Sequence, residues 1–149
     1  MYKQILKISA IAGSLDITAA CIQAYLSGNV APAMVLKYIA SGIYGAKAFS
    51  GGFEFILLGL LVHFLIAFSC TVVFFLFYPK FKLLHKNIFL NSFIIAVVAW
   101  TVTTQIIIPF SRIHKGPFHL SKVVVAIAIL YCCIGLPIAY FTERYYRKG

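Results

Sequence analysis

Four long apolar runs constrain the fold of this chain more than any other feature of its sequence. They extend over about residues 5–26, 53–78, 88–110 and 120–141. Each run approaches the roughly 20 apolar residues that a helix needs to cross a bilayer. Charged residues make up only 11% of the chain, whereas a soluble domain has about 25%. The sequence therefore predicts one all-α domain over residues 1–149, a four-transmembrane-helix bundle.

The connector between the first two runs, residues 27–52, is too long for a tight hairpin. Within it, residues 32–41 begin with Pro32, a residue favoured in the first turn of a helix. Apart from Lys37, this segment is mainly apolar. The glycines that follow it interrupt the remainder of the connector. The pattern predicts a short interfacial helix that lies on the outer surface of the membrane.

Four spans put both chain termini on the same side of the membrane. If that side is cytoplasmic, it holds 8 of the 13 positive charges and the outer side holds 5. Cytoplasmic loops carry an excess of Lys and Arg, so both termini are predicted to be cytoplasmic. The basic residues there are expected to contact anionic lipid headgroups; they include Lys80, Lys82, Lys86, Arg144, Arg147 and Lys148.

The net charge of +10 could also indicate nucleic-acid binding. However, the charges lie at the ends of apolar runs, and the sequence has no nucleic-acid-binding motif, so no nucleic-acid partner is predicted. The four cysteines lie in apolar runs without metal-ligand spacing, which argues against a disulfide framework and a metal site. Only His63 lies deep in a span, whereas a b-type haem needs two histidines. No cofactor is predicted.

Asp16, one of only three acidic residues, lies in the middle of the first apolar run. A carboxylate at that depth is costly, and such residues often mark a functional site. Each run also carries a stripe of small and polar residues, which lets helices approach closely. The stripes are Ser9, Gly13, Asp16, Ala20, Gln23 and Ser27; Gly52, Gly59, His63, Ala67 and Cys70; Asn91, Val98 and Gln105; and Ala128, Cys132, Gly135 and Ala139. We expect these stripes to face the bundle interior.

Asp16 and His63 are predicted to lie at similar depths. A rise of ~1.5 Å per residue puts them roughly 17 Å and 15 Å from opposite sides of a core ~30 Å thick. Trp100, Thr101, Thr104 and Tyr131 pass near that level. The candidate buried polar or ion site consists of Asp16, His63, Thr101, Thr104 and Tyr131. An Asp–His pair can share a proton near neutral pH. Alternatively, it forms a structural hydrogen bond between two helices, or the two residues do not touch.

A series of short motifs follows in order along the chain. They are GSLD at 13–16, PAMVLKYIASG at 32–42, AFSGG at 48–52, LGLLVHF at 58–64, YPK at 78–80, IPFS at 108–111 and GLPIA at 135–139. Together they resemble a group of small, uncharacterised bacterial inner-membrane proteins, loosely similar to the YagU-like family. The resemblance implies a four-helix inner-membrane fold and draws attention to Asp16 and His63. It implies no established activity. Relatives often carry a histidine in helix four where this chain has residues 129–132, ILYC.

No enzyme signature is found in the sequence, so we expect a non-enzymatic membrane protein of the bacterial inner membrane. The leading interpretation is an accessory or scaffolding subunit of a membrane complex, with other membrane subunits or a second copy as partners. One alternative is a small oligomeric proton or ion channel or transporter that uses Asp16 and His63. Another is a protein that handles a lipid or a quinone. Pro137 is expected to kink the fourth helix.

Overall fold

The computed structural model of the chain describes residues 1–107 and 119–148. All regular structure in these residues is helical. Four helical segments are long and apolar enough to cross a membrane, namely Tyr2–Gly28, Phe53–Lys80, Ile88–Gln105 and Leu120–Arg147. The prediction of an all-α chain with four such helices is therefore confirmed. The predicted end of the third run and most of the connector after it lie outside the described residues.

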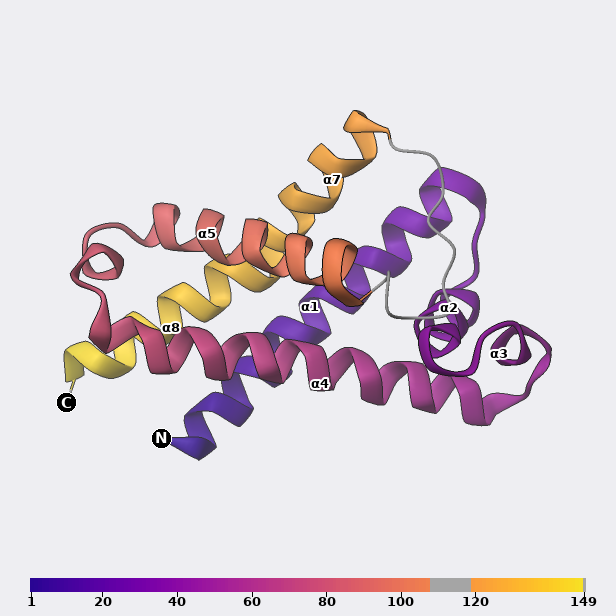
Figure 1. Cartoon of the computed structure of the whole chain (residues 1–149), viewed down its shortest axis with the longest axis horizontal. Coiled ribbons are helices and arrows are strands. Elements are labelled where there is room, and N and C mark those ends of the chain that lie inside the picture. Colours follow the sequence, from indigo (N-terminus) through magenta and orange to yellow (C-terminus); the bar gives the residue numbers. More distant parts are fainter. Residues whose placement is uncertain (108–118, 149) are drawn as a thin grey trace.

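The first span is α1 (Tyr2–Gly28) and the second is α4 (Phe53–Phe77). The third comprises α5 (Ile88–Thr101) and the π-helical η3 (Val102–Ile107), and the fourth comprises α7 (Leu120–Leu130), the π-helical η4 (Tyr131–Gly135) and α8 (Leu136–Lys148). The connectors hold α2 (Pro32–Tyr44), α3 (Lys47–Ser50) and the 3-10 helices η1 (Tyr78–Lys80) and η2 (Lys82–His85). Both termini lie at one end of the bundle, and α2 and α3 lie at the opposite end (Figure 1).

The first connector contains a helix that starts at Pro32, as predicted, and continues to Tyr44, beyond the predicted range of 32–41. Its location at the membrane surface stays a prediction. The chain leaves α1 through Asn29, whose φ of 52° lies in the left-handed region that asparagine tolerates better than most residues. The N–H of Asn29 donates to the oxygen of Tyr25 at 2.8 Å and so closes the last turn of α1. Helix α2 ends at Tyr44, and its C-cap residue Gly45 has a φ of 64°. These two turns bring α2 back against α4.

Three glycines mark the points where helices cross most closely. A Cβ atom on Gly13 of α1 would lie 2.8 Å from the ring of Phe64 of α4. A Cβ atom on Gly59 of α4 would overlap the main-chain oxygen of Leu36 in α2. Gly135 of η4 lies in the same way against the main chain of Ser92 in α5. Small residues thus allow backbone contact between helices, as expected where lipid provides no hydrophobic driving force.

Most of the buried core cluster lies toward the end of the bundle that holds the termini. The core cluster there includes Ile5 and Ile8 of α1, Phe75 of α4 and Ile138 of α8. The Tyr146 hydroxyl donates to the main-chain oxygen of Phe75 at 3.0 Å. The Tyr146 ring also stacks on Tyr78, with 5.4 Å between centroids. These contacts fix the end of α8 against α4.

The fourth span changes direction between α7 and α8 (Figure 1). The π-helix η4 ends directly before Leu136 and Pro137, whose missing N–H and ring disfavour regular α-helical bonding at this point. No residue of α7 is buried, whereas α8 buries Ile138 and Ala139. Because a π turn holds one more residue than an α turn, positions before and after η4 no longer share a face. The predicted stripe of this span is therefore wrong in its first half, since Ala128 and Cys132 are exposed.

Candidate functional site

A cavity of about 420 Å³ lies among α1, α2, α4, α5, η3, α7 and η4. Its walls are mainly apolar and include Ile17, Val62, Ile66 and Leu130. The polar side chains that line it are Asp16, Tyr38, His63, Thr103 and Thr104, together with Cys70 and the indole of Trp100. The arrangement is a mostly apolar chamber with a small number of polar groups, the usual character of a small-molecule site.

Asp16 and His63 meet on the wall of this cavity. The Nε2 atom of His63 lies 3.9 Å from the Oδ2 atom of Asp16, and the two side chains are 12% and 16% exposed. The same Nε2 atom lies 2.9 Å from the main-chain oxygen of Gly13. Since a carbonyl oxygen can only accept, Nε2 carries the hydrogen in this bond. The hydrogen bond that joins α1 to α4 therefore runs from His63 to Gly13, and Asp16 lies beside it.

The Asp16 carboxyl group accepts no hydrogen bond from any residue that the structure describes. The 3.9 Å separation from His63 is too long for one. A largely buried carboxyl group usually needs hydrogen-bond partners. Asp16 is among the residues that line the cavity, so a molecule in the cavity would lie beside it.

The other predicted members of the polar site lie in different places. Thr104 lines the cavity, and its Oγ1 donates to the main-chain oxygen of Trp100 at 2.7 Å. Thr101 is exposed and Tyr131 is half-buried, and neither lines the cavity. Thr103, the neighbour of Thr104 in η3, lines the cavity with it, whereas Thr101 at the end of α5 does not. The structure thus brings three of the five predicted residues together.

Two aromatic residues of the site, Tyr38 and Trp100, are missing from the predicted group. Tyr38 reaches the cavity because α2 crosses α4 at Gly59, where the backbones of the two helices touch. The glycine at position 59 is a sequence signal for a close crossing, but it does not identify the partner helix. Trp100 is the single tryptophan of the chain. It lies one turn before Thr104, and this spacing was the sequence signal for including it in the site.

The basic residues expected at the headgroup level lie at the end of the bundle that holds the termini (Figure 1). Lys80, Lys82 and Lys86 are exposed on the connector between α4 and α5. Arg144 and Arg147 are exposed on α8. The side chain of Lys148 lies outside the described set. In the part of the chain that the structure describes, no cluster of three His, Cys, Asp or Glu side chains could hold a metal ion.

Comparisons with protein families, with curated proteins and with solved structures found no match to this chain.

Proposed function

We propose that this protein is a multi-pass membrane protein that binds a lipid-soluble small molecule in the cavity beside Asp16 and His63, without converting it. The ligand has an apolar body and a polar head that donates a hydrogen bond, for example a quinol hydroxyl. This proposal develops the lipid- or quinone-handling alternative of the sequence analysis. The observation that carries it is the position of Asp16 on the wall of a mainly apolar cavity, with a carboxyl group that receives no hydrogen bond from any described residue.

The size and lining of the cavity support a ligand of this kind. Its volume of about 420 Å³ lies within the range of about 300–1,000 Å³ that is typical of ligand pockets. Apolar side chains from α1, α4 and α7 would contact the body of the molecule. The donated hydrogen would satisfy Asp16, because a carboxylate can only accept. The rings of Tyr38 and Trp100 offer further apolar contact and two hydrogen-bond donors.

The membrane placement is also a proposal. We place the protein in a bacterial inner membrane with both termini cytoplasmic, which agrees with the 8-to-5 distribution of positive charge. Helix α2 then lies at the outer interface. It crosses α4 at Gly59, six residues after the start of α4, a depth of roughly 9 Å. In addition, Lys37 donates its Nζ hydrogen to the main-chain oxygen of Gly51 at 2.6 Å.

A binding experiment tests the proposal. Protein purified in detergent is titrated with a short-chain ubiquinol and with an alkane of similar length, and the melting temperature is recorded. The quinol should raise the melting temperature in a saturable manner, since a ligand that binds only the folded state stabilises it. Asp16→Asn should weaken quinol binding by about tenfold, because a charged acceptor is replaced by a neutral one.

Two further variants separate occupation of the cavity from general perturbation. Ala20→Phe introduces a ring at the cavity wall and should abolish the response to the quinol. Ala10→Phe makes the same change at an exposed position of the same helix and should leave the response intact. Equal stabilisation by quinol and alkane, or equal responses of the two phenylalanine variants, would contradict the proposal.

The accessory-subunit role is a second candidate, favoured by one observation. Helix α7 buries no residue, and its exposed side chains include Leu120, Val124 and Val125. A membrane subunit could pack against this face. Co-purification from native membranes tests this role: a partner in fixed stoichiometry, lost in Val124→Trp, would support it. Isolation of the protein without such a partner would count against it.

A further inference from the structure

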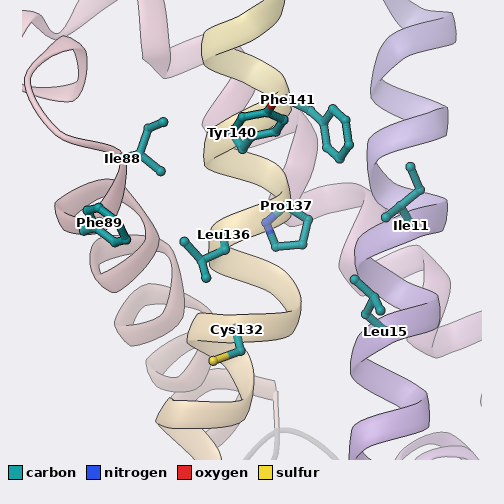
Figure 2. A pocket seen from close by; sticks show the side chains of 9 residues that line it. All are labelled: Ile11, Leu15, Ile88, Phe89, Cys132, Leu136, Pro137, Tyr140 and Phe141. Carbon is teal, nitrogen blue, oxygen red and sulfur yellow. The ribbon is translucent and has the colours of Figure 1, made fainter.

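An open groove runs along one face of the fourth span, outside the Asp16 cavity. It has a volume of about 430 Å³. Cys132 of η4 and Leu136 and Tyr140 of α8 form its floor. Leu136 and Tyr140 are four residues apart and therefore share a face of α8. Figure 2 shows Ile88 and Phe89 of α5 on one side of this floor and Ile11 and Leu15 of α1 on the other. The groove is therefore apolar on its floor and on both sides.

A second hollow of about 320 Å³ continues the groove toward the end of α8. Its lining consists of Ile88, Tyr140, Glu143, Arg144 and Arg147. Ile88 and Tyr140 line both hollows, so the two are adjacent. The four-residue spacing of Leu136 and Tyr140 continues to Arg144. One face of α8 thus changes from apolar to basic over about two turns.

The charges in the second hollow are not balanced. Arg147 pairs with Glu143, with 3.2 Å between Nη1 and Oε1. Arg144 has no ion pair or hydrogen bond with any described residue. Two arginines against one glutamate leave one positive charge. An anion of suitable geometry would complete this site, because guanidinium groups bind phosphate oxygens through two parallel hydrogen bonds.

We propose that the two hollows together bind one anionic phospholipid, with its phosphate at Arg144 and an acyl chain along Leu136 and Cys132. The dimensions fit a lipid of one leaflet. Cys132 and Arg144 are twelve residues apart, or roughly 18 Å along the helix, and half of the hydrocarbon core is about 15 Å thick. The apolar floor therefore lies at the depth of acyl chains when Arg144 lies at the depth of headgroups. The site is independent of the Asp16 cavity.

Native mass spectrometry in detergent tests this site. Protein is titrated with phosphatidylglycerol and, separately, with phosphatidylcholine of the same chain length. One phosphatidylglycerol molecule should be retained at concentrations where phosphatidylcholine is not. Arg144→Gln should weaken retention by about tenfold, the loss expected for one charge-assisted contact. Lys82→Gln removes one exposed charge outside the hollows and should have little effect.

A second pair of variants tests the apolar part of the groove without a change in charge. Leu136→Trp fills the floor and should weaken phosphatidylglycerol retention, whereas Leu65→Trp on an exposed face of α4 should not. Three results would overturn the proposal: equal retention of the two lipids, equal effects of Arg144→Gln and Lys82→Gln, or a protein dimer without lipid that Leu136→Trp dissociates. The last result would assign the groove to a second copy of the chain.

Discussion

The imidazole of His63 donates its Nε2 hydrogen to the main-chain oxygen of Gly13 at 2.9 Å, one turn before Asp16. This contact joins α1 to α4 at the point where Gly13 lets the Phe64 ring approach. The neighbouring acid and imidazole are thus not equivalent. His63 connects two helices, whereas Asp16 lines the cavity and its carboxyl group receives no hydrogen bond from any described residue.

The first prediction follows from this difference. His63→Ala should lower the free energy of unfolding by about 1–3 kcal/mol, because it removes a buried hydrogen bond between helices. Asp16→Ala should have a smaller effect, since no described residue donates to the carboxyl group. Thermal unfolding of both variants in the same detergent measures the two effects. A larger loss for Asp16→Ala would show that the acid, not the imidazole, holds the helices together.

The second prediction concerns the crossing of α2 and α4. Gly59→Ala should destabilise the protein by about 1–3 kcal/mol, because its Cβ meets main-chain atoms of Leu36 that cannot rotate away. Gly28→Ala is the matched control, since the nearest atom to its Cβ would be 3.7 Å away. Melting temperatures of the two variants should therefore differ clearly. If Gly59→Ala behaves like Gly28→Ala, α2 does not lie where the structure places it.

The third prediction concerns Tyr146, which fixes the end of α8 to α4. Tyr146→Phe should cost about 1 kcal/mol, because the ring contacts with Phe75 and Tyr78 remain while the hydrogen bond to the Phe75 oxygen is lost. Tyr145→Phe is the control: its ring also packs on Phe75, but its hydroxyl bonds to no described residue. Chemical denaturation of both variants provides the comparison. Similar midpoints for the two would argue against a role for the Tyr146 hydroxyl.

The fourth prediction concerns orientation in the membrane. In intact cells, Ser50→Cys should react with a membrane-impermeant maleimide, because Ser50 is exposed on α3 at the end of the bundle opposite the termini. Lys82→Cys, on the connector between α4 and α5, should react only after permeabilisation. The four native cysteines are first replaced by alanine to remove background labelling. The reverse pattern would place both termini outside.

Much of this fold could be predicted from simple properties of the sequence. The apolar runs locate the spans because a bilayer requires helices of a certain length. The rise per residue alone predicts that Asp16 and His63 lie at the same depth in the membrane, because α1 and α4 run in opposite directions. The stripe of small and polar residues on α1 also predicts which side of this helix is exposed. Leu6, Ile11, Leu15 and Ile22 lie on that outer side. These inferences depend on local geometry that neighbouring helices do not change.

Other features depend on packing between distant segments and were not predictable. Asn91 is buried as expected, but Val98, which was expected to share its face, is 50% exposed. The buried face of α5 is completed by Ser92, Ile95, Ala96 and Ala99. The contact between Ser92 and Gly135 sets that rotation, and nothing in either segment alone indicates it. The π-helix at Tyr131–Gly135 likewise has no periodic signature. It changes which residues of the fourth span face the cavity.

Because of this π-helix, the structure of the fourth span depends on how many residues it contains as well as on which residues they are. Removal of one residue within Tyr131–Gly135 would restore the α-helical number of residues in this turn and rotate α7 by about 100° relative to α8. Ala126 and Leu130 would then leave the cavity wall, although every side chain outside the deletion would be unchanged. A single-codon deletion in this segment would thus reshape the chamber more than most substitutions in its lining, while the packed end of the bundle would keep its own contacts.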